Sequence, residues 1–484
     1  MTSSAASLHK PLVVDLDGTL VRTDLLVESF NQFLIHHPFQ CWMPLWWLTQ
    51  GKVVLKEELA QRTDLDVSAL PYNAALIEWL RSEKKQGRRL ILATASHTRL
   101  AHQVAAHLQL FDEVLATDHG INLKAQAKAD ALVARFGKQG VDYVGNDWPD
   151  LAVWACADTA HVVDASDALI QRAKAVGTVG QVFESQTRGR VWSFLKAIRI
   201  HQWMKNLLVF VPLLAAHEYT NWQRDQLGLL AFVIFSITAS SVYLLNDLVD
   251  VPSDRHHLRK RERPFAAGDL SLLVGWLTWP VLLLMAIGLS LWCMPVLFTL
   301  SLGVYFVLTV AYSLYLKQLA IVDVLTLAAL YTLRIMAGAA AIDVPVSFWL
   351  LLFSMFVFLS LALIKRYSEL LAARTVGKTG VLRGRGYRPE DLDWVSNLGS
   401  SAGLIAVLVL ALYIQDGQAA HLYAAPKLIW LVCPALLFWM SRAWMIAHRG
   451  QMHEDPIVFA LKDKVSWCLG AFMLMVFGLA RVMS

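Results

Sequence analysis

The sequence predicts two domains of different classes: a soluble α/β domain with a helical cap, followed by an all-α polytopic membrane domain of about nine transmembrane helices. The 484 residues are 56% hydrophobic, which is too apolar for two soluble domains. Residues 10–190 have the composition of a globular domain, whereas residues 204–482 carry repeated apolar runs. The composition changes near residues 181–190. We therefore divide the chain into 1–185 and 186–484, with the cap at about 24–88.

Short apolar runs that end in polar side chains predict the strands of the first domain. Residues 12–20 read L-V-V-D-L-D-G-T-L, an apolar strand that ends in Asp15 and Asp17. A second apolar strand ends in Thr94, Lys128 lies on an expected helix, and Y-V-G-N-D-x-x-D at 143–150 ends a third strand. These four motifs, in this order, resemble those of the haloacid-dehalogenase-like (HAD) phosphatases.

That resemblance implies a hydrolase in which Asp15 attacks phosphorus, while Asp17 protonates the leaving oxygen and then activates water. Thr94 and Lys128 would hold the phosphoryl oxygens. The implied ligands of a magnesium ion are Asp15, Asp17, Asp147 and Asp150.

The chain departs from the HAD pattern at Asn146, which stands where the family has the first acid of G-D-x-x-x-D. One negative charge is lost there unless Asp147 supplies it. A scaffold or regulatory domain without catalysis is therefore the alternative for this half.

The expected cap contains a cluster of aromatic residues. Residues 39–48 read F-Q-C-W-M-P-L-W-W-L. Tryptophan clusters usually belong to a core, but so many in so short a run also suit the interface of a membrane. Both interpretations stay open from the sequence.

About nine apolar spans follow in the second half. Their centres lie near Leu208, Phe235, Leu282, Tyr305, Ala329, Phe353, Ala406, Leu436 and Met473. Alternate connections are rich in lysine and arginine, for example residues 255–263 and 366–388. By the positive-inside rule these connections face the cytoplasm. We expect a multi-pass protein of the inner (cytoplasmic) membrane with both sites on the cytoplasmic side. Whether Arg259 and Arg261 serve only topology stays open.

Three aspartates stand at the expected cytoplasmic end of the second span. Residues 246–255 read N-D-L-V-D-V-P-S-D-R, which spaces Asp247, Asp250 and Asp254 at i, i+3 and i+7. On a continued helix they share one face, where three negative charges repel one another. A magnesium ion that itself holds a diphosphate would turn this repulsion into binding. A solvated helix end is the alternative.

This motif resembles the first aspartate-rich motif of the UbiA superfamily of intramembrane transferases, and the resemblance covers nearly the whole membrane half. The family implies that the motif binds a magnesium diphosphate. Members that use prenyl diphosphates have a second aspartate-rich motif after the sixth span, where this chain has K-R-Y-S-E-L at 365–370. Two cations and one acid weaken the alternative of an aromatic or haem-type prenyltransferase.

Further stretches resemble the decaprenyl-phosphate phosphoribosyltransferase type of this superfamily: residues 199–206, residues 260–268, K-R-Y-S-E-L, and E-D-P at 454–456 with Asp463. The resemblance implies transfer of 5-phosphoribose from phosphoribosyl diphosphate to a polyprenyl phosphate, toward an arabinose precursor of the cell envelope. Asp247 and Asp250 would be catalytic, with Asp254 as a third ligand of Mg²⁺. The expected substrate-binding residues are Lys205, Asn206, Asn246, Arg255, Lys260, Arg263, Tyr312, Lys317, Lys365, Arg366 and Glu369.

The remaining composition adds limits. The five cysteines show no C-x-x-C pairing and no histidine at zinc-ligand spacing, so we expect buried free thiols. Residues 1–10 lack the organisation of a signal peptide, so the first domain is expected in the cytoplasm. Most basic residues flank the apolar runs, which explains the net charge of +5 without a nucleic-acid partner. The lipid chain length, the fate of the sugar and any homo-oligomer stay open.

Overall fold

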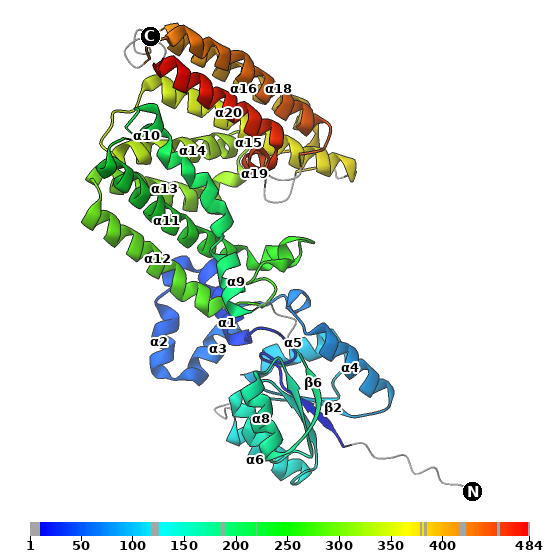
Figure 1. Cartoon of the computed structure of the whole chain (residues 1–484). Coiled ribbons are helices and arrows are strands. Elements are labelled where there is room, and N and C mark those ends of the chain that lie inside the picture. Colours follow the sequence, from blue (N-terminus) through cyan, green and yellow to red (C-terminus); the bar gives the residue numbers. More distant parts are fainter. Residues whose placement is uncertain are drawn as a thin grey trace. The chain divides into compact units, whose positions relative to one another are not determined.

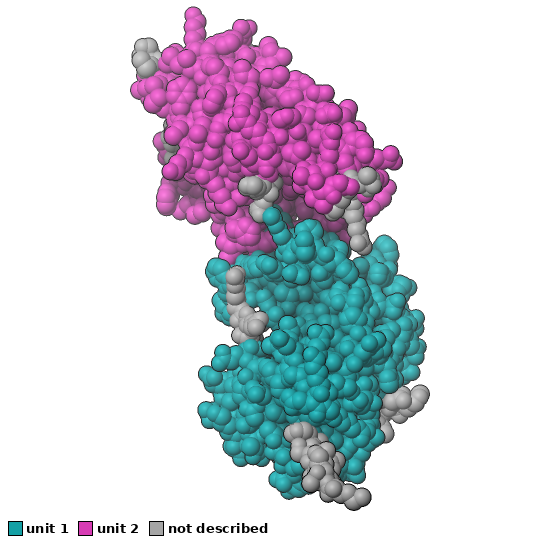
Figure 2. All heavy atoms as spheres, turned by 90° about the vertical axis from the view of Figure 1, so that its right-hand side faces the viewer, with its two compact units in different colours: residues 1–198, 243–278 teal, residues 199–242, 279–484 magenta. Residues whose placement is uncertain are grey.

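The structure is a computed structural model that describes residues 10–117, 125–184, 189–218, 220–377, 380–381, 385–415, 423–452 and 455–482. The chain forms two compact units, shown in two colours in Figure 2. The first unit comprises Met1–Ile198 and Tyr243–Thr278, and the second Arg199–Val242 and Trp279–Ser484. The division of the chain at residues 185 and 186 stays a prediction.

A parallel sheet organises the first unit. In its described part, six strands lie in the order β3-β2-β1-β4-β5-β6. Their bounds are β1 (Leu12–Val14), β2 (Leu90–His97), β3 (Glu113–Thr117), β4 (Asp142–Gly145), β5 (Thr159–Val163) and β6 (Thr178–Phe183). All three residues of β1 are buried, as expected for a central strand of a sheet that is covered on both faces. The carboxyl ends of β1, β2 and β4 therefore meet at one edge.

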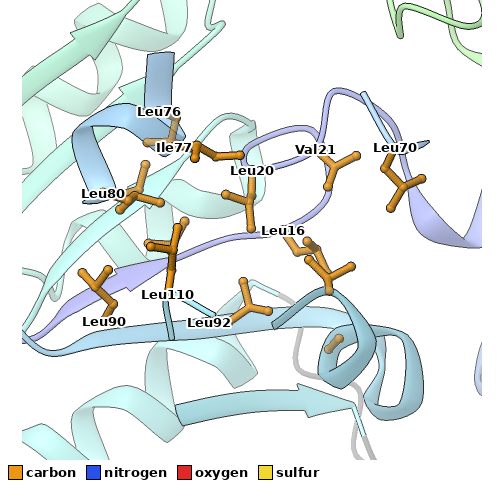
Figure 3. Packing of buried hydrophobic residues seen from close by; sticks show 14 of the residues in the cluster. Leu16, Leu20, Val21, Leu70, Leu76, Ile77, Leu80, Leu90, Leu92 and Leu110 are labelled. Carbon is orange, nitrogen blue, oxygen red and sulfur yellow. The ribbon is translucent and has the colours of Figure 1, made fainter. Parts of the chain in front are cut away.

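Helices cover both faces of this sheet. Leu12 and Val14 face a core that includes Leu76 and Leu80, seen in part in Figure 3, whereas Val13 faces a second core with Trp154. This alternation follows from the two-residue period of a strand. The helices are α4 (Ala74–Lys85), α5 (Thr98–Leu108), α6 (Gln126–Phe136), α7 (Leu151–Trp154) and α8 (Asp167–Val176), with the short η3 (Trp148–Asp150) before α7.

The segment between β1 and α4 is helical, as predicted. It contains α1 (Leu25–His36), η1 (Pro38–Gln40), α2 (Met43–Gln50), α3 (Lys52–Arg62) and η2 (Val67–Ala69). Asp24 caps α1 by accepting the N–H of Leu26 at 2.8 Å. Phe33, Leu34, Trp47 and Leu59 form a small core of this segment, and Trp276 packs against it.

Eight helices in the described part of the chain are long and apolar enough to cross a membrane. They are α11 (Trp222–Arg255), α12 (Leu272–Cys293), α13 (Val296–Leu314), α14 (Val322–Ala341), α15 (Phe348–Thr375), α16 (Leu392–Gln415), α18 (Val432–His448) and α20 (Lys464–Val482), with η7 (Pro389–Asp391) before α16 and η8 (Pro426–Leu431) before α18. Eight of the predicted centres, from Phe235 to Met473, fall on these helices. The protein is therefore an integral membrane protein, and Figure 1 shows the helices along the chain. Shorter described helices are α9 (Arg190–Ala197), η5 (Lys260–Glu262), η6 (Leu316–Gln318) and α19 (Pro456–Lys462).

Two sequence predictions need correction. The expected span near Leu208 is a 3-10 helix, η4 (Ile200–Phe210), that continues into α10 (Val211–Ala215). Left-handed backbone at Arg199 and His217, with φ of 53° and 57°, ends this stretch on both sides, so it is too short to count among the eight spans. The five cysteines are free as expected, but Cys41 and Cys468 are exposed rather than buried.

Candidate active sites

The first candidate site lies at the carboxyl edge of the sheet. Asp15 directly follows β1, Thr94 lies in β2, and Asp150 ends η3, just after β4. Lys128 lies in the first turn of α6 and is buried. Because β1 pairs with both β2 and β4, residues that are far apart in the sequence come together at this edge.

A chain of hydrogen bonds links the buried groups. Lys128 Nζ donates to Asp15 Oδ1 at 2.6 Å and to the Tyr143 hydroxyl at 2.9 Å. That hydroxyl donates to Asp150 Oδ1 at 2.8 Å. Burial raises the pKa of Asp15 to about 6, although the charge of Lys128 acts to lower it. The lysine therefore has a charged partner here, and its predicted role in holding a phosphoryl group stays a prediction.

Asp17 has a different environment. Its carboxylate accepts hydrogen bonds from Ser96 Oγ at 2.6 Å, Thr94 Oγ1 at 3.3 Å and the N–H of Leu25 at 2.9 Å. Burial, together with the charge of Asp24, raises the pKa of Asp17 to about 7. A carboxyl group with such a pKa can give and take a proton near neutral pH.

The acids of this edge suit a hard cation. The charge of Asp150 acts to raise the pKa of Asp15, so the two carboxylates repel one another and a divalent cation would relieve this. Asp147 is exposed and caps the N–H of Trp148 at 2.8 Å. Asn146, the departure from the family pattern, accepts a hydrogen bond from Thr19 at 3.1 Å. It also lies so close to Gly18 that a Cβ there would be 2.4 Å from its Nδ2 atom.

The second set of acids lies near the end of α11. The helix runs through Arg255, so Asp247, Asp250 and Asp254 share one helix at the predicted spacing. Arg263 NH1 bridges two of them, at 3.1 Å from Asp247 Oδ1 and 2.6 Å from Asp254 Oδ2. The other oxygen of Asp254 is buried without a hydrogen-bond partner, and Lys260 Nζ lies 4.0 Å from it. Such an orphaned carboxylate oxygen fits a hard cation.

Magnesium remains a prediction at both places. Within the part of the chain that the structure describes, no group of three or more His, Cys, Asp or Glu side chains gathers closely enough to hold a metal ion. Asn246, the first residue of the aspartate motif, is half-buried.

Arg255, the last residue of the aspartate motif, pairs with a residue of α1 in the same compact unit. Its guanidinium donates to both oxygens of Glu28 in α1, and its Nε donates to the carbonyl of Ala266. This arrangement occupies the hydrogen-bond donors of Arg255 within the protein. The role of Arg255 in substrate binding stays a prediction.

The second unit holds four of the expected cations, Lys205, Lys317, Lys365 and Arg366. Lys205 Nζ lies 2.5 Å from Asp455 Oδ2, and Lys365 Nζ lies 4.0 Å from the same oxygen. Burial alone would raise the pKa of Asp455, but these two lysines hold it below its usual value. The structure thus brings together residues from η4, from α15 and from the E-D-P stretch. Glu454 of that stretch lies outside the described residues.

The K-R-Y-S-E-L stretch divides into two parts. Arg366 is buried and pairs with Asp323 at 2.8 Å and with Glu369. Lys365 remains one-third exposed. Tyr312 accepts a hydrogen bond from Arg385 at 3.2 Å, and Arg385 lies 3.8 Å from Glu369. Lys317 follows in η6 and is half-buried.

Asn206 is buried and accepts a hydrogen bond from Arg334 Nε at 2.9 Å. No motif in the sequence pointed to Arg334, Asp323 or Glu28. A lone arginine inside an apolar span was a signal for Arg334, because buried membrane charges are rare. Nothing in the local pattern pointed to Glu28.

Comparisons with known proteins identify the family of the membrane half. Residues 207–469 match the model of the UbiA prenyltransferase family. The chain belongs to this family. The described parallel sheet gives the N-terminal unit the α/β fold that its resemblance to the HAD phosphatases implies, so the predicted fold class is confirmed.

Several relatives are similar over most of their own length. The uncharacterized protein y4nM of Sinorhizobium fredii is 35% identical, covering 97% of this chain and 91% of its own length. The nodulation protein NoeC of Azorhizobium caulinodans is 38% identical, covering 60% of this chain and 91% of its own length. A decaprenyl-phosphate phosphoribosyltransferase of Mycolicibacterium smegmatis is 32% identical, covering 57% and 88%. The predicted resemblance to this UbiA type is confirmed.

Proposed function

We propose that this UbiA protein is a magnesium-dependent polyprenyl-phosphate phosphoribosyltransferase that also carries a phosphatase. It transfers 5-phosphoribose from phosphoribosyl diphosphate to a polyprenyl phosphate, and its HAD-like domain then removes the 5-phosphate of the lipid-linked sugar. Both sites face the cytoplasm from the inner membrane, as the distribution of arginine and lysine favours.

The pairing within K-R-Y-S-E-L carries the transferase part of this proposal. Glu369, the single acid of the stretch, forms an ion pair with Arg366. Lys365 and Lys205 both lie near the carboxylate of Asp455. These contacts support sites for phosphate oxygens rather than a second acidic site for a magnesium diphosphate. The likeness to decaprenyl-phosphate phosphoribosyltransferases points the same way.

The proposed transfer needs little proton chemistry. The bond between C1 of the ribose and the diphosphate breaks, and an oxygen of the lipid phosphate forms the new bond to C1. The acceptor phosphate is already ionised, so no strong general base is required. Asp247 and Asp250 would hold magnesium, and this ion would supply positive charge to the leaving diphosphate.

The proposed hydrolysis uses the two motif aspartates in turn. Asp15 attacks phosphorus, the bond to the sugar oxygen breaks, and Asp17 gives that oxygen a proton. Asp17 then takes a proton from the water that opens the aspartyl-phosphate, which releases inorganic phosphate. Thr94 and Lys128 would hold the phosphoryl oxygens meanwhile. The raised pKa of Asp17 suits this exchange of a proton.

Two labels test the transfer. Purified protein in vesicles receives polyprenyl phosphate, Mg²⁺ and phosphoribosyl diphosphate labelled either in the ribose or in the β-phosphate. The ribose label should enter the lipid fraction, and the β-phosphate label should appear as free diphosphate. If phosphoribosyl diphosphate stays unused while the same vesicles prenylate an aromatic acid, the proposal is wrong and the aromatic prenyltransferase is favoured.

A further inference from the structure

The helical segment between β1 and α4 exposes an apolar face that the proposed function does not use. Phe39 is 94% exposed, and four further large side chains in this short stretch are between 44% and 67% exposed. We call this set the aromatic face, and it consists of Phe39, Trp42, Leu45, Trp46 and Leu48.

The inner side of α2 packs against the core of its own segment. Trp47 is buried, its ring meets that of Phe33 at 5.3 Å, and the guanidinium of Arg62 lies 5.3 Å from it. The helix α2 is therefore already folded against its own core, and the aromatic face is left over. A helix on the surface of a soluble domain normally turns polar residues outward. A contiguous apolar patch of this kind marks an interaction surface.

Continuity with a membrane span identifies what this surface meets. Trp276 lies in the second turn of α12, donates from Nε1 to Asn31 Oδ1 at 2.8 Å, and packs edge-on against Phe30. The core behind α2 thus includes the first turns of a helix that crosses the bilayer. Leu273 and Leu277 of those turns are exposed, as expected of side chains that face lipid.

The charge pattern suits the headgroup region. Residues 38–51 contain no charged side chain, so entering the interface requires no charge to be desolvated. Lys52, exposed at the start of α3, follows directly and can meet anionic headgroups. Tryptophan is the residue type that membrane interfaces favour most.

We infer that the aromatic face is an interfacial anchor that inserts into the headgroup region of the bilayer that α12 crosses. The consequence for catalysis rests on the proposed function. The helix α1 leads from the phosphatase edge toward this anchor, since the N–H of Leu25 donates to Asp17 at 2.9 Å. The anchor then holds the phosphatase edge near the surface where a lipid-linked phosphosugar is presented.

Cys41 lies within this stretch and is exposed, so it can report its surroundings. The full chain, with its other four cysteines replaced by serine, carries a fluorescent probe at Cys41 and is reconstituted in vesicles of neutral and anionic phospholipids. The matched control has Cys41→Ser and Lys85→Cys, which moves the probe to an exposed position of α4. Brominated phospholipids report contact with lipid, and iodide reports contact with water. Neither measurement depends on enzymatic activity.

The anchor predicts that brominated lipid lowers the emission at Cys41 by about twofold, while iodide quenches the probe at position 85 more strongly. Trp42→Asp with Trp46→Asp should abolish the lipid quenching at Cys41 without unfolding the protein, since both side chains point away from the core. Equal iodide quenching at both positions would overturn the inference. So would a Cys41 probe shielded from both quenchers, because protein, such as a second copy of the chain, would then cover this face.

Discussion

Arg255 and Glu28 form a two-point ion pair that joins the end of α11 to α1. The donor–acceptor distances are 2.7 Å and 3.0 Å, and both side chains are more than nine-tenths buried. Thr23 donates to the same carboxylate at 2.8 Å. The last residue of the aspartate motif is thus fixed by α1, which lies in the same compact unit.

Glu28→Gln should destabilise the protein strongly, because it leaves the buried guanidinium of Arg255 without its counter-charge. We expect a loss of about 3–5 kcal/mol in unfolding free energy. Thermal unfolding in detergent measures it. The matched control is Glu58→Gln, which breaks a partly exposed pair with Arg62 and should cost less than about 1 kcal/mol. Equal effects of the two variants would show that the buried pair contributes no more than a surface pair.

Asp247→Asn and Asp250→Asn should each abolish the transfer of phosphoribose, because a magnesium ion loses a charged ligand. Hydrolysis of a soluble phosphomonoester by the same preparations should be unchanged, since Asp15 and Asp17 are intact. Comparing the two activities in one sample separates loss of the site from loss of the protein. Transfer at the normal rate in either variant would contradict the assignment of these aspartates.

Lys365 and Arg366 are neighbours in the sequence, but replacing each by alanine should affect a different property of the protein. Loss of Lys365, which is one-third exposed, should raise the KM for phosphoribosyl diphosphate by about ten- to a hundredfold, because charged hydrogen bonds contribute about 1.5–3 kcal/mol. Arg366→Ala should instead lower stability by about 3–5 kcal/mol, since the buried Asp323 loses its counter-charge and keeps only the hydrogen bond from Tyr387. Steady-state kinetics and thermal unfolding of both variants check this. Unchanged kinetics for Lys365→Ala would leave that lysine a role in topology alone.

The rate of phosphomonoester hydrolysis should depend on pH through Asp15 and Asp17. Burial raises the pKa of Asp15 to about 6, so the nucleophile is protonated below that pH and the rate should rise as pH increases through it. The pKa of Asp17 is raised to about 7, so its proton is lost above that pH and the rate should fall. A cation bound at Asp15 favours the ionised carboxylate, so saturating Mg²⁺ should move the acid limb to lower pH. An acid limb independent of the Mg²⁺ concentration would argue against Asp15 as a ligand.

The sequence predicted what depends on local order. Adjacent parallel strands end at one edge, so an acid after β1 and a hydroxyl in β2 had to meet. A continued helix places Asp247, Asp250 and Asp254 on one face whatever surrounds it. Apolar length was sufficient to place eight spans.

Other features depend on contacts between distant residues. The partner of Arg255 lies 227 positions away along the chain, so no periodicity could indicate it. Arg263 bridges Asp247 and Asp254 only because the chain turns back after α11. The stretch near Leu208 is apolar enough for a span, and left-handed residues at its two ends shorten it.

The coupling of the two activities is tested most directly by the mass of the lipid product. Asp15→Asn removes the proposed nucleophile with almost no change in volume, but it leaves the buried Lys128 without its counter-charge. Thermal unfolding first establishes that the variant is folded, and the folded variant should still transfer phosphoribose. Incubated with phosphoribosyl diphosphate, polyprenyl phosphate and Mg²⁺, it should accumulate the lipid-linked 5-phosphoribose. Wild-type protein should release inorganic phosphate and yield a lipid lighter by one phosphate group. If both proteins accumulate the same phosphorylated lipid, the N-terminal domain does not act on this product, and the proposed two-step reaction is wrong.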